Sequence, residues 1–164
     1  MTTMSAPDLS IRRAHAADVE RMVVIWQEVS ELLTNADRRW KLAAQGSEAW
    51  AAAVQEWLTR EDMLVVVAER KGTVIGYAVG QVAANAAGFE PAQIGLINDF
   101  AIDPHGRGDG GIGTQLVGAI RAWLRERGIT YLQARVPTSQ PIAQTFWRAS
   151  GASVLFDTMW MKIE

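Results

Sequence analysis

Hydrophobic positions recur along this sequence with two different periods, and the period predicts which segments are helices and which are strands. Apolar residues at helical spacing predict four helices, which run from Asp18 to about Leu33, from Ser47 to Leu58, from Ile112 to Gly128 and from Gln140 to Gly151. Apolar and β-branched runs predict strands at 10–14, 63–69, 73–81, 96–102 and 131–136, with one or two more within 154–163. In chain order these are a strand, two helices, three strands, and then a helix, a strand, a helix and the final strands, so helices and strands combine in an α/β protein.

The connections between these elements predict how the strands pair. A turn at 70–72 predicts an antiparallel hairpin, whereas the strand at 96–102, the helix after it and the strand at 131–136 predict a parallel crossover. Gly76 and Gly80 interrupt a strand, which predicts a bulge or a close backbone contact. We expect one α/β domain over residues 1–164, with a mixed, mostly antiparallel sheet and helices on both of its faces.

The stretch 95–128 joins a covered strand, a glycine-rich loop and an amphipathic helix. The first turn of a helix has amide N–H groups without internal partners, and the helix dipole adds partial positive charge there. Glycines allow the backbone to come close to a ligand. The stretch therefore predicts an anion site, usually for phosphate, to which Arg107 adds charge and Thr114 a hydroxyl.

Two kinds of protein use such a site. Gly108, Gly110 and Gly113 fit the dinucleotide fingerprint G-x-G-x-x-G between a strand and a helix. That fingerprint normally opens its domain and is followed about 20 residues later by an acid that binds ribose. The next strand holds Gln133 and Arg135 and no acid, so a nucleotide-binding module is the weaker interpretation.

The alternative is a resemblance to the GCN5-related N-acetyltransferase (GNAT) family, whose acetyl-CoA motif is R/Q-x-x-G-x-G/A after an apolar strand. Gly111-Ile112-Gly113 resembles the closing glycines, and Ile102-Asp103-Pro104 resembles the end of the strand. The loop is one residue longer than the pattern, because Gly108 stands at the basic position and Arg107 precedes it. The resemblance implies that the cofactor is bound by the backbone of Phe100, Ala101 and Ile102 and by Arg107, Gly108, Asp109, Gly110, Gly111, Ile112, Gly113 and Thr114.

The resemblance extends to the last predicted helix, where the family commonly has N-x-x-A-x-x-x-Y. Gln140 occupies the position of the asparagine that contacts the pantetheine arm in the family, and its side-chain amide can make the same contact. Trp147 stands at the tyrosine that often protonates the CoA thiolate. An indole N–H donates a hydrogen bond but does not titrate, so Trp147 cannot supply that proton. It can hydrogen-bond the sulfur or pack the cofactor.

A base that deprotonates the amine is the remaining catalytic group. Asp99 is the best-placed acid and Glu90 is the alternative. Alternation along a strand predicts that Asn98 and Asp99 point to opposite faces, so that only one faces the cleft. A structural role for Asp99 and deprotonation through ordered water both remain open.

Composition narrows the classes of function. The chain has 164 residues and no cysteine, and the absence of cysteine excludes disulfides and thiolate chemistry. Its formal net charge of −2 gives no sign of non-specific nucleic-acid binding. His15 and His105 are too few and too distant in sequence for a zinc site, and we expect no metal. The first residues lack the features of a signal peptide and no apolar run is long enough for a membrane span, so we expect a cytoplasmic protein.

The resemblance implies an enzyme that transfers the acetyl group of acetyl-CoA to a primary amine. A degenerate domain that binds acyl-CoA as a sensor or partner module is the competing hypothesis. The acceptor is open, from a small molecule to a peptide N-terminus or a protein lysine. The tryptophans of the first two helices are expected in the core, and the final strands are plausible places for a homodimer to form.

Overall fold

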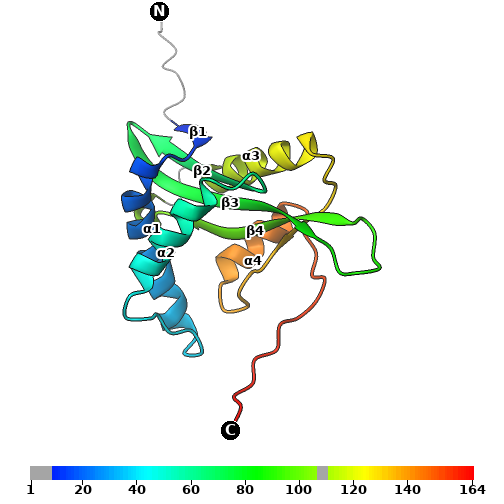
Figure 1. The fold of residues 1–164 in the computed structure, drawn as a ribbon. Coiled ribbons are helices and arrows are strands. Elements are labelled where there is room, and N and C mark those ends of the chain that lie inside the picture. The colour runs from blue at the N-terminus through cyan, green and yellow to red at the C-terminus, as the bar shows by residue number, and fades with distance from the viewer. Residues whose placement is uncertain (1–8, 107–110) are drawn as a thin grey trace, which may run out of the picture.

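A five-stranded mixed sheet forms the centre of this computed structural model, which describes residues 9–106 and 111–164 (Figure 1). The strands lie in chain order, β1 (Leu9–Arg13), β2 (Met63–Arg70), β3 (Thr73–Ala84), β4 (Gln93–Ile102) and β5 (Leu132–Ala134). The first four pair antiparallel, and β5 pairs parallel to β4. The predicted α/β fold with a mixed, mostly antiparallel sheet is confirmed.

Helices cover both faces of this sheet, as predicted. Helices α1 (Val19–Ala36) and α2 (Gly46–Trp57) pack on one face, and α3 (Ile112–Glu126) packs on the other. Two short 3-10 helices, η1 (Ala16–Asp18) and η2 (Pro104–Gly106), precede α1 and follow β4. Helix α4 (Pro141–Ala149) lies on the α3 side, where its aromatic residues reach the end of β4. No helix in the described ranges is long and apolar enough to span a membrane.

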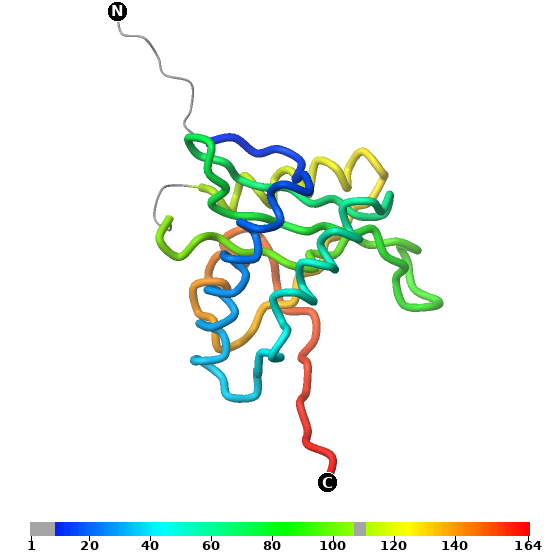
Figure 2. Tube along the Cα trace, turned by 60° about the vertical axis from the view of Figure 1, so that its left-hand side comes forward, coloured from blue at the N-terminus to red at the C-terminus, as the bar shows by residue number. Residues whose placement is uncertain are grey.

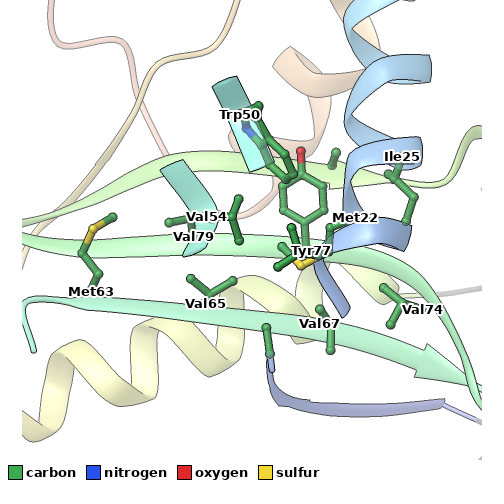
Figure 3. Packing of buried hydrophobic residues seen from close by; sticks show 13 residues of the cluster. Met22, Ile25, Trp50, Val54, Met63, Val65, Val67, Val74, Tyr77 and Val79 are labelled. Carbon is green, nitrogen blue, oxygen red and sulfur yellow. The ribbon is translucent and has the colours of Figure 1, made fainter. Parts of the chain in front are cut away.

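The core under α1 and α2 consists mainly of aliphatic side chains packed around the buried rings of Trp50 and Tyr77 (Figure 3). The side chain of Trp50 is 8% exposed and stacks on Trp26, with ring centroids 5.5 Å apart. Tyr77 of β3 is fully buried and its ring centroid lies 5.2 Å from that of Trp50. Aromatic residues bury 150–250 Å² each, so this cluster is a large part of what fixes α2 on the sheet. The expectation that Trp50 belongs to the core is confirmed.

A β-bulge in β4 changes which way its side chains point. Val79 pairs with Asp99, whereas the next residue of β3, Gly80, pairs with Ile97, so Asn98 is an extra residue. The expected alternation of Asn98 and Asp99 is therefore wrong. The Asn98 amide donates to Gln81 at 2.7 Å, and Asp99 accepts from Tyr77, two residues on the same face of β3. A bulge redirects side chains in this way because it adds one residue to one strand only.

Glycines of the sheet let α3 approach closely. A Cβ atom at Gly80 would lie 2.6 Å from a side-chain methyl of Ile120, and one at Gly95 would lie 2.4 Å from Leu124. Gly76 is similarly confined, at 3.1 Å from the carbonyl oxygen of Ala101. The close contacts predicted for Gly76 and Gly80 are confirmed, and the bulge lies opposite Gly80.

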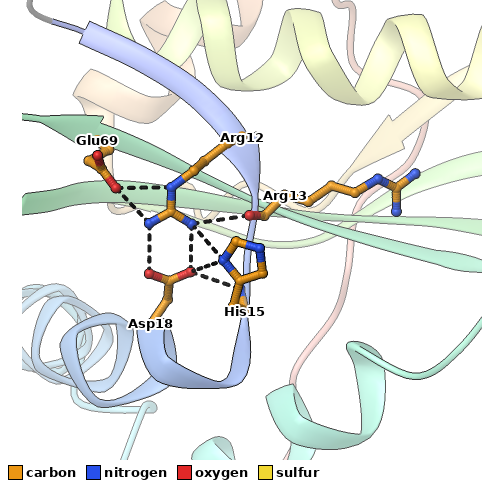
Figure 4. A network of polar contacts seen from close by, with 5 residues as sticks. All are labelled: Arg12, Arg13, His15, Asp18 and Glu69. Atoms are coloured by element: carbon orange, nitrogen blue, oxygen red, sulfur yellow. Dashed lines mark hydrogen bonds and ion pairs between the residues drawn. The ribbon is translucent and has the colours of Figure 1, made fainter. Parts of the chain in front are cut away.

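A charged network ties β1 to β2 and to the start of α1 (Figure 4). The Arg12 guanidinium donates to both carboxylate oxygens of Asp18, at 2.8 and 2.9 Å, and to Glu69 at 2.6 Å. Asp18 also accepts from the backbone N–H of His15 at 2.8 Å. These hydrogen bonds, with the Arg12 bonds first, lower the pKa of Asp18.

The C-terminal segment does not form the predicted strands. Residues 152–164 adopt no regular structure and are exposed, and the segment leads away from the sheet after α4 (Figures 1 and 2). The prediction of one or two strands within 154–163 is wrong for this structure, although the apolar alternation on which it rested is real. Strand β5 is also shorter than predicted, with three residues.

Candidate active site

The outer edge of β4 is open beyond its first half. Pairing with β5 covers only Gly95, Leu96 and Ile97, so in the described part of the chain no strand pairs with that edge from Asn98 to Ile102. The Asp103 N–H donates to Ile75 of β3, and amide direction alternates along a strand. The amides of Phe100 and Ile102 therefore face the open edge.

Not all of the three amides expected to bind the cofactor are free to do so. The alternation that turns Phe100 and Ile102 outward turns the N–H of Ala101 toward β3. The outward N–H of Phe100 donates at 2.8 Å to the carboxylate of Asp99. Ile102 is thus the residue of this trio whose amide faces the opening without a described partner.

The carboxylate of Asp99 is held from three directions on the α1–α2 side of the sheet. It accepts from the indole N–H of Trp50 at 2.7 Å, from the Tyr77 hydroxyl at 3.2 Å and from the Phe100 amide. Burial raises the pKa of Asp99, and these hydrogen bonds oppose the rise without cancelling it. Burial likewise raises the pKa of Tyr77 well above its usual value, so this hydroxyl stays protonated. The arrangement gives a carboxyl group with an altered pKa beside the open strand edge.

Sequence reasoning missed the partners of Asp99. It placed Trp50 in the core by helical spacing and gave Tyr77 no role. Both residues are indeed buried, but each also donates a hydrogen bond to Asp99. Figure 3 shows Trp50 and Tyr77 side by side in the core. A signal existed, since a buried tyrosine or tryptophan usually needs a hydrogen-bond partner. Glu90, the alternative base, lies in the β3–β4 loop, at the opposite end of β4 from the glycine loop.

The N-terminus of α3 has the features expected of an anion site. Gly111 precedes it with a φ of 87°, and its carbonyl accepts the first helical bond, from Gln115. No side chain caps this end, so the amides of Ile112, Gly113 and Thr114 have no acceptor in the described part of the chain. The predicted residues Arg107, Gly108, Asp109 and Gly110 lie outside the described residues.

Three aromatic rings lie beside this helix end. Phe100 stacks on Phe146 with ring centroids 5.5 Å apart, and Trp147 meets both rings edge-on. A Cβ atom at Gly113 would lie 3.0 Å from Phe146 and 3.2 Å from Phe100, so the rings reach this glycine backbone. The structure thus brings Phe100, Gly113 and Trp147 together, with Gln140 half-buried at the start of the same α4.

A second charged pair supports the end of β4. The buried carboxylate of Asp103 accepts from the Arg21 guanidinium of α1 at 2.5 Å and from the His105 amide at 2.9 Å. Sequence reasoning used Asp103 only as a strand-end signal and missed Arg21. Ligand atoms of Glu28, Asp103 and His105 lie within 4.8 Å of one another, but Arg21 already balances the charge of Asp103.

The comparisons with known proteins agree with this geometry. The family model described as the acetyltransferase (GNAT) family matches residues 26–152, well over half of the chain. A variant of the BH1408 protein from Bacillus halodurans shares the fold with a TM-score of 0.81 and 20% identity, covering 94% of this chain and 99% of that chain. A comparison with curated proteins finds no match.

Two further solved structures are similar over nearly their whole length. AAC(6')-Iy in complex with a bisubstrate analogue of CoA and acetylneamine matches with a TM-score of 0.76 and 16% identity, over 96% of this chain and 99% of that one. The aminoglycoside acetyltransferase meta-AAC0020 from an uncultured soil metagenomic sample, in complex with trehalose, matches with a TM-score of 0.69 and 17% identity. The match covers 96% of this chain and 97% of that chain. Identities this low establish the fold alone, and the family model establishes membership. The chain belongs to the acetyltransferase (GNAT) family.

Proposed function

We propose that this protein acetylates the primary amine of a small molecule, with the acceptor on the α1–α2 side of β4. The observation that carries the proposal is the position of Asp99. Its carboxylate lies beside an open strand edge, with the unpartnered amides of α3 farther along the chain. The strand and the helix that follows it thus carry, in one stretch of chain, amides suited to an anionic donor and a carboxylate suited to accept a proton.

Acetyl-CoA supplies the activated thioester when it is bound. The amides at the N-terminus of α3 suit its pyrophosphate, because they carry partial positive charge and have no partner within the described residues. Arg107 adds a positive charge in this proposal. The outward amide of Ile102 suits the thioester carbonyl or the pantetheine arm, and Gln140 and Trp147 line the other side from α4.

Asp99 accepts the amine proton in this proposal. A base works best when its pKa lies near the operating pH, and burial moves the pKa of Asp99 in that direction. The Trp50 and Tyr77 bonds hold the carboxylate in one orientation, which an exposed side chain would lack.

The small-molecule acceptor is supported by the structural neighbours. Two of those described above are aminoglycoside acetyltransferases, so aminoglycosides and polyamines are the first amines to test. A hollow at the start of α2, lined by Trp26, Gln27, Leu42 and Ser47 among others, lies on the same side as Asp99 and is a candidate position for the acceptor.

Release of CoA in the presence of an amine panel tests this function directly. The chain has no cysteine, so a thiol reagent reports free CoA alone. We expect at least one amine to give turnover that Asp99→Asn lowers by about 100-fold or more, the effect of losing a general base. Glu126→Gln, an exposed acid at the end of α3, is the matched control and should keep full activity. Equal activity of Asp99→Asn and the native protein would remove Asp99 from the mechanism.

The pH dependence separates a base from a residue that only orders the site. The bond from Trp50 lowers the pKa of Asp99, so Trp50→Phe should raise that pKa further. The acidic limb of the kcat/KM profile should then move to higher pH, because activity needs the deprotonated carboxylate. Tyr77→Phe should move the acidic limb less, because the hydrogen bond from Tyr77 to Asp99 is longer than the one from Trp50. A profile unchanged by Trp50→Phe would contradict the role of Asp99 as base.

A catalytically degenerate acyl-CoA-binding domain is the second candidate, and Trp147 favours it. Trp147 packs on Phe100 and Phe146, and its indole N–H has no acceptor in the described ranges. Trp147→Tyr restores a group that can give a proton to a thiolate. We expect this variant to raise kcat if the protein is an enzyme. Acetyl-CoA binding by titration calorimetry, with no amine giving turnover for either form, would instead establish the binding module.

A further inference from the structure

The β-bulge in β4 brings two neighbouring polar side chains to one face of the sheet. Asp99 pairs with Val79, and Asn98 is the extra residue, whose side chain reaches Gln81 on the same α1–α2 side. Successive side chains of a regular strand point to opposite faces, so this polar pair depends on the bulge. Asn98 is exposed, and the three hydrogen bonds that hold the Asp99 carboxylate do not involve it. Support of Asp99 therefore does not explain where Asn98 points.

Asn98 is the last member of a hydrogen-bonded chain that begins in the loop between α2 and β2. The guanidinium of Arg60 donates to both carboxylate oxygens of Asp62, at 2.9 and 2.6 Å. Asp62 also accepts at 3.2 Å from the side-chain amide of Gln81, which in turn accepts at 2.7 Å from the side-chain amide of Asn98. The backbone N–H of Val82 donates to the carbonyl oxygen of Asp62 at 2.8 Å, so the loop is fixed beside Gln81.

The carboxylate in this chain sets the orientation of both amides. An ionised carboxylate only accepts hydrogen bonds, so Gln81 must turn its NH2 group to Asp62 and its oxygen to Asn98. The bonds from Arg60, and then from Gln81, lower the pKa of Asp62, so this carboxylate is ionised at neutral pH. Asn98 gives its own NH2 group to Gln81 and keeps its carbonyl oxygen Oδ1 for another partner. Within residues 9–106 and 111–164 this oxygen accepts no hydrogen bond, so Asn98 offers an oriented acceptor next to Asp99.

We propose that Asn98 is a specificity-determining residue, which accepts a hydrogen bond from a second donor group of the bound amine. Gln81 and Asp62 are the positioning residues that hold its oxygen outward. The inference rests on the proposed function for the position of the reacting amine at Asp99. Consecutive Cα atoms lie about 3.8 Å apart, so the second group is separated from the reacting amine by a short carbon chain. The class of substrate is therefore an amine that also carries a hydroxyl or a second amino group, and not a plain alkylamine.

The expected preference is modest because Asn98 is exposed. A hydrogen bond between neutral groups that water can replace changes an affinity by roughly 3- to 10-fold. The second group does not react, so its bond is equally strong in the bound substrate and in the transition state. Such a bond lowers KM and leaves kcat unchanged. A residue with only a structural role would affect all amines alike.

Two isomeric amines test the proposal. Aminobutanol carries an O–H group, whereas methoxypropylamine carries an ether oxygen that cannot donate, and both have the same charge. NMR titration of the isotope-labelled full chain measures the binding of each amine without acetyl-CoA. We expect aminobutanol to bind roughly 3- to 10-fold more tightly, and Asn98→Ala to remove the difference. Gln93→Ala removes an exposed amide at the other end of β4 and is the matched control, which should keep the difference.

A second variant keeps the proposal testable if the bulge does not tolerate alanine. Gln81→Leu leaves Asn98 in place but removes the group that orients it, so its amide is free to turn and the preference should fall. A preference that survives Asn98→Ala or Gln81→Leu would overturn the proposal. Equal binding of the two isomers to the native protein, or binding of neither at millimolar concentration, would overturn it as well.

Turnover of the same two amines separates this inference from the acetyl-transfer proposal on which it rests. We expect the isomers to differ in KM and to share one kcat, and a difference confined to kcat would contradict the role of Asn98. CoA release with no preference between the isomers would overturn the inference and leave acetyl transfer supported. Preferential binding of aminobutanol without CoA release from any amine would support the role of Asn98 and overturn acetyl transfer.

Discussion

The two ends of this sheet are built differently. The region from β1 to β4 is covered by α1, α2 and α3, and these strands and helices together contribute nearly all of the buried hydrophobic residues of the described chain. The region from β5 onward consists of a three-residue strand, a helix with no fully buried residue and an exposed segment. The candidate active site lies between them. One region holds the carboxylate of Asp99, and the other packs the rings of Phe146 and Trp147 beside the N-terminus of α3.

The largest expected effect on stability comes from a comparison of two tryptophans, one in each region. Trp50→Ala removes a side chain that is almost fully buried and that bonds Asp99, so it should cost about 3–5 kcal/mol of unfolding free energy. Trp147→Ala removes a half-buried ring and should cost less than half of that. Urea unfolding of both variants measures the ratio. Equal losses would mean that α4 is as firmly packed as α2.

A smaller effect compares two glycines. Gly80→Ala forces a Cβ against buried Ile120 and should cost about 1–3 kcal/mol, because neither neighbour can move away. Gly113→Ala meets Phe146 of the loosely covered α4, which can shift, so its stability should fall by less. Acetyl-CoA affinity should respond in the opposite order, with the larger loss at Gly113. Calorimetric titration and thermal unfolding of the same two samples check both statements.

The smallest effect concerns the charged network of the first region. Asp18→Asn should cost about 1–2 kcal/mol at pH 7, since Arg12 then loses a charged partner. The pKa of Asp18 is lowered in the folded protein, so its contribution is present above the ordinary carboxyl pKa and is lost as the pH falls through the folded value. The stability gap between native protein and variant should therefore close on acidification. Glu56→Gln, in an exposed pair with Arg60, should show no such gap.

Periodicity predicted the elements well where a helix or strand has one covered face. The four helices, the hairpin of β2 and β3 and the parallel β5 all follow from local spacing and turn residues. The bulge at Asn98 does not, because it depends on how β3 and β4 settle against each other. The prediction of the final strands is wrong for a related reason. A strand forms only where a neighbouring strand pairs with it, and the sequence of the strand itself does not show whether that neighbour is there.

The candidate site was predictable in part. The amides at the start of α3 follow from a glycine loop before an amphipathic helix. The hydrogen bonds that hold Asp99 come from Trp50 and Tyr77, which are distant in the chain and whose apolar bodies mark them as core residues. Arg21 and Asp103 lie 82 positions apart in the sequence, and no local sequence pattern predicts that they pair.

The extra residue in β4 also sets where this protein can change in length over time. Removing Asn98 would leave Ile97 and Asp99 opposite the adjacent residues Gly80 and Val79, so the pairing would become regular and the remaining side chains of β4 would keep their faces. Removing Leu96 from the regular part of the strand would instead exchange the two faces for everything before it or after it. The hairpin loop at 85–92 can gain or lose residues without that penalty. Variation in length is therefore expected at the loop, tolerated at the bulge and excluded in the regular part of the strand.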